Sequence, residues 1–266
     1  MILTCNETMS PSFSCSSTSS VSSASTVSTS PLSESYDKIA TPPTGQNEET
    51  LKALMSRNVC LERKGMLLNT STLEHEFEKW VGTLWYMVDQ FHFDHDTVHV
   101  AVRTFSVYLS TLPTFVPWSS LKWERYASLW IGMKMKDTTN PMTLSLKLFL
   151  RSMLGRKGIM KSEMTRLLKA ETWVLQSNRF LLSYPLASDY ADVLLHMLDA
   201  GSEVRNKTFQ VLACLSSRIR FVYQNPLDVA VTAIYYVNPV CIENLVNFVP
   251  SCHQAMCDVM IESMFK

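Results

Sequence analysis

The sequence predicts an all-α protein, and three observations support this prediction. After about residue 47, apolar residues recur at spacings of three and four, as on one face of a helix. The 7 glycines and 11 prolines fall mainly between these stretches, and no alternating apolar and polar run is long enough for a sheet. With 266 residues, 46% of them hydrophobic, the chain can bury a core in one large or two small domains.

Residues 1–47 are expected to form a disordered tail. Ser and Thr dominate this segment, so it cannot bury enough apolar surface to offset the entropy lost on ordering. Ser10, Ser30 and Thr41 each precede a proline and are minimal sites for proline-directed kinases. A Ser-rich segment also produces such dipeptides by chance, so regulatory phosphorylation and coincidence both stay open.

A short helix and five longer helices are predicted next. The short helix, over residues 48–57, carries Leu51, Leu54 and Met55 on one face that could pack on a following domain. Pro113 ends the second of the longer helices, and Gly155 and Gly158 separate the last two. The five longer helices are predicted over residues 72–91, 94–112, 119–137, 141–154 and 161–177.

A second group of five helices is predicted after Pro185. Gly201, Pro226, Pro239 and Pro250 mark its boundaries. The helices are predicted over residues 188–200, 202–223, 225–237, 240–248 and 251–265. The expected organisation is therefore a tail over residues 1–47, a first domain with its leading helix over 48–183, and a second domain over 184–266.

Charge and hydropathy exclude several classes of partner. The net charge is zero, so no general basic field would attract nucleic acid or an anionic membrane. No apolar stretch approaches the roughly 18 residues of a membrane span, and the first residues do not form a secretory signal. The 7 cysteines form no CxxC pair, which suits a reducing compartment. We expect a soluble intracellular protein with no nucleic acid or membrane partner.

Catalysis and cofactor binding are not expected. The sequence has no glycine-rich phosphate loop and no nucleophile elbow, so we predict no catalytic residues and no cofactor. His95 and His99 would share a helical face, but a zinc site needs a third ligand, and we expect no metal. One basic stretch could bind phosphate or form a solvated turn, and the solvated turn is favoured because no aromatic residues interleave with it. It comprises Arg151, Arg156, Lys157 and Lys161.

Lys134 and Glu171 are the two most informative charged residues. Lys134 ends an otherwise apolar segment, and Glu171 lies in a second amphipathic segment. A lysine at the end of a buried stripe is costly to desolvate, so it should have a carboxylate or backbone partner. The alternative is a lysine that extends its amino group into solvent while neighbouring residues simply fill the core.

From about residue 48 to its end, the chain resembles the cyclins. A short leading helix followed by two five-helix domains describes the cyclin fold. Lys134 resembles the Lys of the family's Ala-Ser-Lys-x-Glu-Glu motif, and Glu171 resembles the Glu of its fifth helix. Three further segments resemble cyclin motifs: Trp80-Val81-Gly82-Thr83-Leu84, Thr97-Val98-His99-Val100-Ala101-Val102 and Tyr108-Leu109-Ser110.

The resemblance implies a cyclin, a regulatory subunit that binds and activates a cyclin-dependent protein kinase in cell-cycle control. It would act as a heterodimer rather than a homo-oligomer, in the nucleus or cytoplasm. Lys134 and Glu171 would hold backbone groups near the mobile helix of the kinase. The apolar residues implied to line the pocket for that helix are Ile131, Met135, Leu175 and Leu182.

Two alternatives from other classes remain open. One is a cyclin-fold scaffold with no kinase partner. The other is a transcription-factor-type protein that binds DNA and polymerase, although the sequence has neither the basic face nor the leading zinc ribbon that would favour it.

The substrate-docking patch of the family would fall on Leu73, Phe77 and Trp80. Glu76 and Lys122 depart from the family pattern here, because they would put charge into an apolar groove. We therefore expect docking of basic Arg-x-Leu motifs to be lost or altered.

Overall fold

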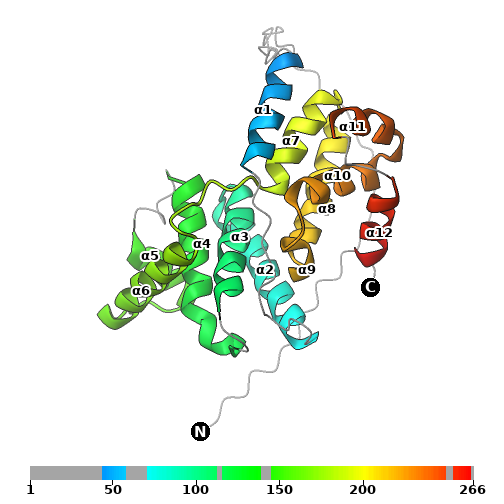
Figure 1. Cartoon of the computed structure of the whole chain (residues 1–266). Coiled ribbons are helices and arrows are strands. Elements are labelled where there is room, and N and C mark those ends of the chain that lie inside the picture. The colour runs from blue at the N-terminus through cyan, green and yellow to red at the C-terminus, as the bar shows by residue number, and fades with distance from the viewer. Residues whose placement is uncertain (1–43, 58–70, 113–115, 139–144, 250–253, 265–266) are drawn as a thin grey trace, which may run out of the picture. The chain divides into compact units, whose positions relative to one another are not determined.

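A computed structural model of the protein describes residues 44–57, 71–112, 116–138, 145–249 and 254–264. These residues form helices joined by loops and turns (Figure 1). All of these residues belong to one unit, Thr41–Lys266. They include no strand, which confirms the all-α prediction, and none of their helices is long and apolar enough to cross a membrane. The predicted tail up to residue 43, with Ser10, Ser30 and Thr41, lies outside the described residues.

The first group of helices surrounds α3, whose residues from Thr97 to Leu109 are buried except for the partly buried His99. The group consists of α2 (Ser71–Phe91), α3 (Asp96–Thr111), η1 (Trp118–Leu121), α4 (Lys122–Lys136), α5 (Leu146–Leu154) and α6 (Lys161–Ser177). The bounds of α6 are those predicted, whereas the third predicted helix opens as the 3₁₀ turn η1. The first residues of the predicted fourth helix, 141–144, lie outside the described residues.

The second group surrounds α10 (Pro226–Val237), which is buried from Pro226 to Tyr235 except for the partly buried Asp228. Its other elements are α7 (Ala187–Met197), α8 (Ser202–Ser216), α9 (Ile219–Val222), η2 (Pro239–Cys241), α11 (Ile242–Phe248) and α12 (Gln254–Met264). The prediction of one helix over residues 202–223 is wrong. The chain leaves the helical conformation at Arg218, which is extended, so α8 and α9 are separate.

The leading helix α1 (Thr44–Ser56) packs on α7 of the second group. It begins at Thr44 rather than at the predicted Glu48. Leu51 is buried in the second core, and the Tyr190 hydroxyl donates a hydrogen bond to the Leu54 carbonyl oxygen at 2.8 Å. The prediction that one apolar face of this helix packs on a domain is confirmed for Leu51.

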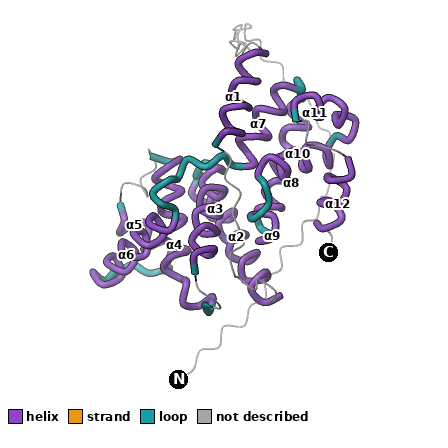
Figure 2. The backbone as a smooth tube through the Cα atoms, in the orientation of Figure 1, coloured by secondary structure: helices purple, strands orange, loops and turns teal. Residues whose placement is uncertain are grey.

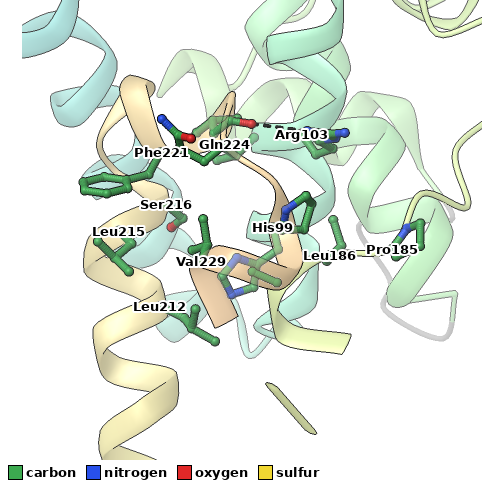
Figure 3. A pocket seen from close by; sticks show the side chains of 14 residues that line it. His99, Arg103, Pro185, Leu186, Leu212, Leu215, Ser216, Phe221, Gln224 and Val229 are labelled. Carbon is green, nitrogen blue, oxygen red and sulfur yellow. Dashed lines mark hydrogen bonds between the residues drawn. The ribbon is translucent and has the colours of Figure 1, made fainter. Parts of the chain in front are cut away.

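The segment between α6 and α7, residues 178–186, joins the two groups (Figure 2). The α9 turn forms a second connection, because Ile219 is buried in the first core. The Arg103 guanidinium of α3 donates to the Val222 carbonyl oxygen at 3.2 Å, and the Tyr223 hydroxyl donates to the Ser106 carbonyl oxygen at 3.2 Å. A cavity of about 70 Å³ lies at this junction, with His99 and Arg103 in its lining (Figure 3).

Candidate partner-binding site

Lys134 and Glu171 lie against each other where α4 packs on α6. The Lys134 ammonium donates a hydrogen bond to Oε1 of Glu171 and forms an ion pair with it. The carboxylate partner expected for Lys134 is therefore Glu171. The Lys134 side chain is 42% exposed and that of Glu171 only 10%, so the pair presents its cationic side to solvent.

Aromatic packing supports the position of Lys134. Its Nζ lies 5.5 Å from the centroid of the Trp130 ring, within reach of a cation–π interaction. The Trp130 ring in turn packs on Phe149 of α5, with 5.0 Å between ring centroids. The Tyr126 hydroxyl also donates to the Met153 carbonyl oxygen at 3.2 Å. These contacts hold α5 against α4 beneath the ion pair.

The residues that follow Lys134 tie the end of α4 to the start of α3. Asp137 accepts hydrogen bonds from the Asp94 backbone N–H, at 2.7 Å, and from the Thr97 hydroxyl. Lys136 pairs with Asp96 at 2.9 Å. These contacts give Lys136 and Asp137 a structural role between α4 and the start of α3.

The four apolar residues predicted to line a partner pocket differ in exposure. Met135 is 44% exposed, and Leu175 and Leu182 are partly buried at the edge of the first core. Ile131 is only 2% exposed and belongs to the interior of that core. Met135, Leu175 and Leu182 can therefore contribute surface next to the ion pair, whereas Ile131 supports α4 from within.

Phe180, which the sequence did not single out, is 65% exposed just beyond the end of α6. Arg179 and Phe180 both have left-handed backbone conformations, with φ of 51° and 57°. Each such non-glycine residue costs on the order of 1 kcal/mol or more, so the surrounding hydrogen bonds must hold it in place. The Asn178 amide provides one such tie by donating to the Thr104 carbonyl oxygen at 3.1 Å. No local sequence signal marks this turn, because glycine is absent from it.

Leu168 and Leu181 are further exposed apolar side chains, on α6 and in the turn after it. Leu168 is 49% exposed on α6, one helical turn before Glu171, and Leu181 is 57% exposed. Exposed apolar side chains on the helices that carry a charged pair suit a protein-binding surface.

The predicted docking patch is filled by its own aromatic residues. Phe77 is fully buried, Trp80 is 7% exposed and Leu73 is partly buried. The Trp80 ring lies 4.7 Å from that of Phe105 and 6.2 Å from that of Trp118, between ring centroids. Phe77 and Trp80 are thus core residues that offer little surface to a peptide.

The histidines at the start of α3 pack on an aromatic ring. The His95 and His99 rings lie with their centroids 5.6 and 5.4 Å from that of Trp85. Among the residues that the structure describes, no group of three or more His, Cys, Asp or Glu side chains is arranged to hold a metal ion.

Comparison with solved structures identifies the fold. A chain of the crystal structure of the yeast RNA Pol II CTD kinase CTDK-1 complex matches with a TM-score of 0.54 and 14% sequence identity, over 72% of the present chain. The protein has a cyclin-like fold. The match covers 61% of the yeast chain, which is less than two thirds of its length. No protein-family model matches the sequence, and no curated protein is significantly similar to it.

The cyclin-like fold places the ion pair on the third and fifth helices of its first group, α4 and α6. The same two helices carry Met135, Leu168 and Leu175. Lys134 and Glu171 therefore occupy the helices on which the resemblance to cyclins placed the kinase contacts.

Proposed function

We propose that the protein is a cyclin, a non-catalytic regulatory subunit that binds and activates a cyclin-dependent protein kinase in cell-cycle control. One observation carries this proposal. The Lys134–Glu171 pair lies at the surface of a cyclin-like fold, on two helices, α4 and α6, that also carry the exposed apolar side chains of Met135 and Leu168. The complex would be a heterodimer located in the nucleus or the cytoplasm.

The polar part of the surface would recognise backbone groups of the kinase. The Lys134 ammonium has three N–H donors, and Glu171 accepts one of them. The exposed side of the ammonium can donate to carbonyl oxygens at the end of a kinase helix, where such oxygens lack partners within the helix. Because Glu171 fixes the position of the ammonium, less conformational entropy is lost when the kinase binds.

Activation follows if this surface fits only the active conformation of the kinase. A partner that binds one of two conformers shifts the population toward that conformer by its difference in affinity for the two. Apolar contacts from Met135, Leu175 and Phe180 would supply most of the binding free energy through burial.

Reversing the ion pair provides the test. The combined change Lys134→Glu and Glu171→Lys keeps opposite charges in contact but presents an anion to the kinase. The tagged full-length variant and wild type are used to capture kinases from cells that express the protein, and bound kinase is quantified by mass spectrometry. We expect a fall of roughly ten-fold, equivalent to about 1.4 kcal/mol.

Glu48 and Lys52 are exposed four residues apart on α1 and provide a matched control. The changes Glu48→Lys and Lys52→Glu exchange their charges without touching α4 or α6, and they should leave kinase capture unchanged. Circular dichroism and thermal unfolding show whether both variants remain folded. Equal capture by wild type and the folded Lys134/Glu171 variant would contradict the proposal and favour a cyclin-fold scaffold with no kinase partner.

A further inference from the structure

A groove of about 540 Å³ lies on the second group of helices, between α8 and the end of α10. Lys207, Val211 and Cys214 lie along one side of α8 at spacings of four and three, and Arg218 follows just past its end. Tyr236 and Val237, the last two residues of α10, form the opposite side. None of the residues of the α4–α6 site lines this groove.

Apolar side chains provide most of the groove's surface. Leu215, which is 2% exposed, belongs to the second core and forms its floor. Val211 and Val237 are partly buried beside it, and the Tyr236 side chain is 43% exposed at the rim. A ring in this position can cover an apolar side chain of a ligand.

The charged residues that line the groove are both cationic. Lys207 pairs at 2.7 Å with Glu203, but both side chains are more than half exposed, so the pair contributes little stability. The partly buried guanidinium of Arg218 makes no hydrogen bond or ion pair with another described residue. Among the described residues, no Asp or Glu lines the groove. The guanidinium of Arg218 has five N–H donors and is well suited to binding a carboxylate.

We propose that this groove binds a short acidic segment of a partner protein, in which a Glu or Asp side chain lies beside a bulky apolar one. The carboxylate pairs with the Arg218 guanidinium through two parallel hydrogen bonds, and the apolar side chain covers Leu215 beneath the Tyr236 ring. A volume of about 540 Å³ accommodates a few residues of an extended chain. A nucleic acid strand would need a longer row of cations and several exposed rings.

Cys214 provides a reporter for occupancy, because its thiol is exposed in the wall of the groove. The rate of alkylation at Cys214 is measured by peptide mass spectrometry in the full-length protein. The probes are two synthetic peptides, Gly-Ser-Glu-Glu-Leu-Phe-Gly-Ser and the same peptide with Gln in place of both Glu residues. We expect the acidic peptide to slow alkylation at a concentration about five-fold lower than the Gln peptide requires.

Arg218→Gln completes a double-mutant cycle with these two peptides. The variant should bind the acidic peptide no more tightly than the Gln peptide, which removes the five-fold difference. Arg166→Gln serves as the control, because it removes the same charge from an exposed residue on α6. It should preserve the difference between the peptides.

Four results would overturn the proposal. Equal protection by both peptides would show that the groove does not recognise the carboxylate. If Arg166→Gln abolished the difference between the peptides as Arg218→Gln is expected to do, the difference would arise from the overall charge of the protein. Stronger protection by a single-stranded oligonucleotide of about twelve nucleotides would reassign the groove to nucleic acid. Alkylation of Cys214 in the free protein as slow as that of the buried Cys241 would show that the groove is already covered. None of these measurements requires a kinase, so they are independent of the proposed function.

Discussion

At the scale of single residues, the candidate site combines an unequally exposed ion pair with a strained turn. The Lys134 side chain is 42% exposed, so solvent screens the pair and it contributes only about 0–1 kcal/mol to stability. Removing Lys134 alone is costlier, because it leaves the nearly buried Glu171 carboxylate without its cation. Phe180 is different, since its backbone conformation costs free energy and its side chain contributes little burial.

We predict that Phe180→Gly stabilises the protein while weakening partner binding. Glycine adopts a positive φ without strain, so the free energy of unfolding should rise by about 0.5–1 kcal/mol, as measured by urea denaturation. Phe180→Ala is the matched control, because it removes the same exposed ring but keeps the strain. Both variants should reduce kinase capture, and only Phe180→Gly should gain stability.

A partner for Lys134 was predictable from the sequence because local chemistry required one. Lys134 needed an anion, and the amphipathic segment around Glu171 supplied one. The position of Ile131 was not predictable, because α4 is apolar on two sides and only tertiary packing decides which side faces the core. Phe180 was not predictable because its exposure depends on the left-handed turn.

At the scale of elements, the close approach of α3 and α4 fixes the position of Lys134. A Cβ atom on Gly132 would lie 2.6 Å from the Thr97 carbonyl oxygen and 3.3 Å from the Ala101 nitrogen. These neighbours are backbone atoms of a buried helix, so they cannot move aside without displacing α3.

We predict opposite effects for alanine at two helical glycines. Gly132→Ala should lower the free energy of unfolding by about 1–3 kcal/mol, because the added methyl group overpacks the interface between α3 and α4. Gly82→Ala should raise it by about 0.5–1 kcal/mol, because Gly82 is exposed in α2 and nothing lies within 4 Å of the added atom. Urea denaturation measures both, and destabilisation by Gly82→Ala would contradict this account.

The bounds of helices were predictable where capping signals existed. The bounds of α6 follow from the turn around Gly155 and Gly158 and from the end of its apolar periodicity. The break between α8 and α9 had no such signal, because no glycine or proline occurs near residues 217–218. The chain breaks there because Ile219 packs in the first core and Phe221 in the second.

At the scale of the whole molecule, the junction between the two groups contains a titratable residue. Burial lowers the pKa of His99 from 6.5 to about 4; Lys136 and the neighbouring His95 reinforce this shift, and Asp96 and Asp94 oppose it. Figure 3 shows His99 among the apolar side chains that line the junction cavity. The folded protein therefore keeps this imidazole neutral at physiological pH.

We predict that acidification destabilises the protein through His99. Between pH 6.5 and about 4, the unfolded chain binds a proton at this residue and the folded chain does not. The contribution of the neutral His99 to the free energy of unfolding is therefore fully present above pH 6.5 and is lost as the pH falls. Between pH 7 and pH 5 the loss should be roughly 1–2 kcal/mol. Urea denaturation at pH 7 and pH 5 measures this loss in free energy of unfolding. The loss should be smaller in His99→Gln than in the wild type by roughly 1–2 kcal/mol. Parallel losses in both proteins would show that other groups cause the pH dependence.

Some helices of each group pack on segments that lie much later in the sequence, and this limits which contacts can form while the chain is being translated. Among the described helices, α1 is translated before the others, but α7, on which it packs, follows more than 130 residues later. The first group likewise lacks Ile219 until α9 has been translated. The order in which these helices are made thus differs from the order in which they can be buried. On the nascent chain, Leu51 and the residues that pack around Ile219 therefore lack their native contacts until α7 and α9 have been translated.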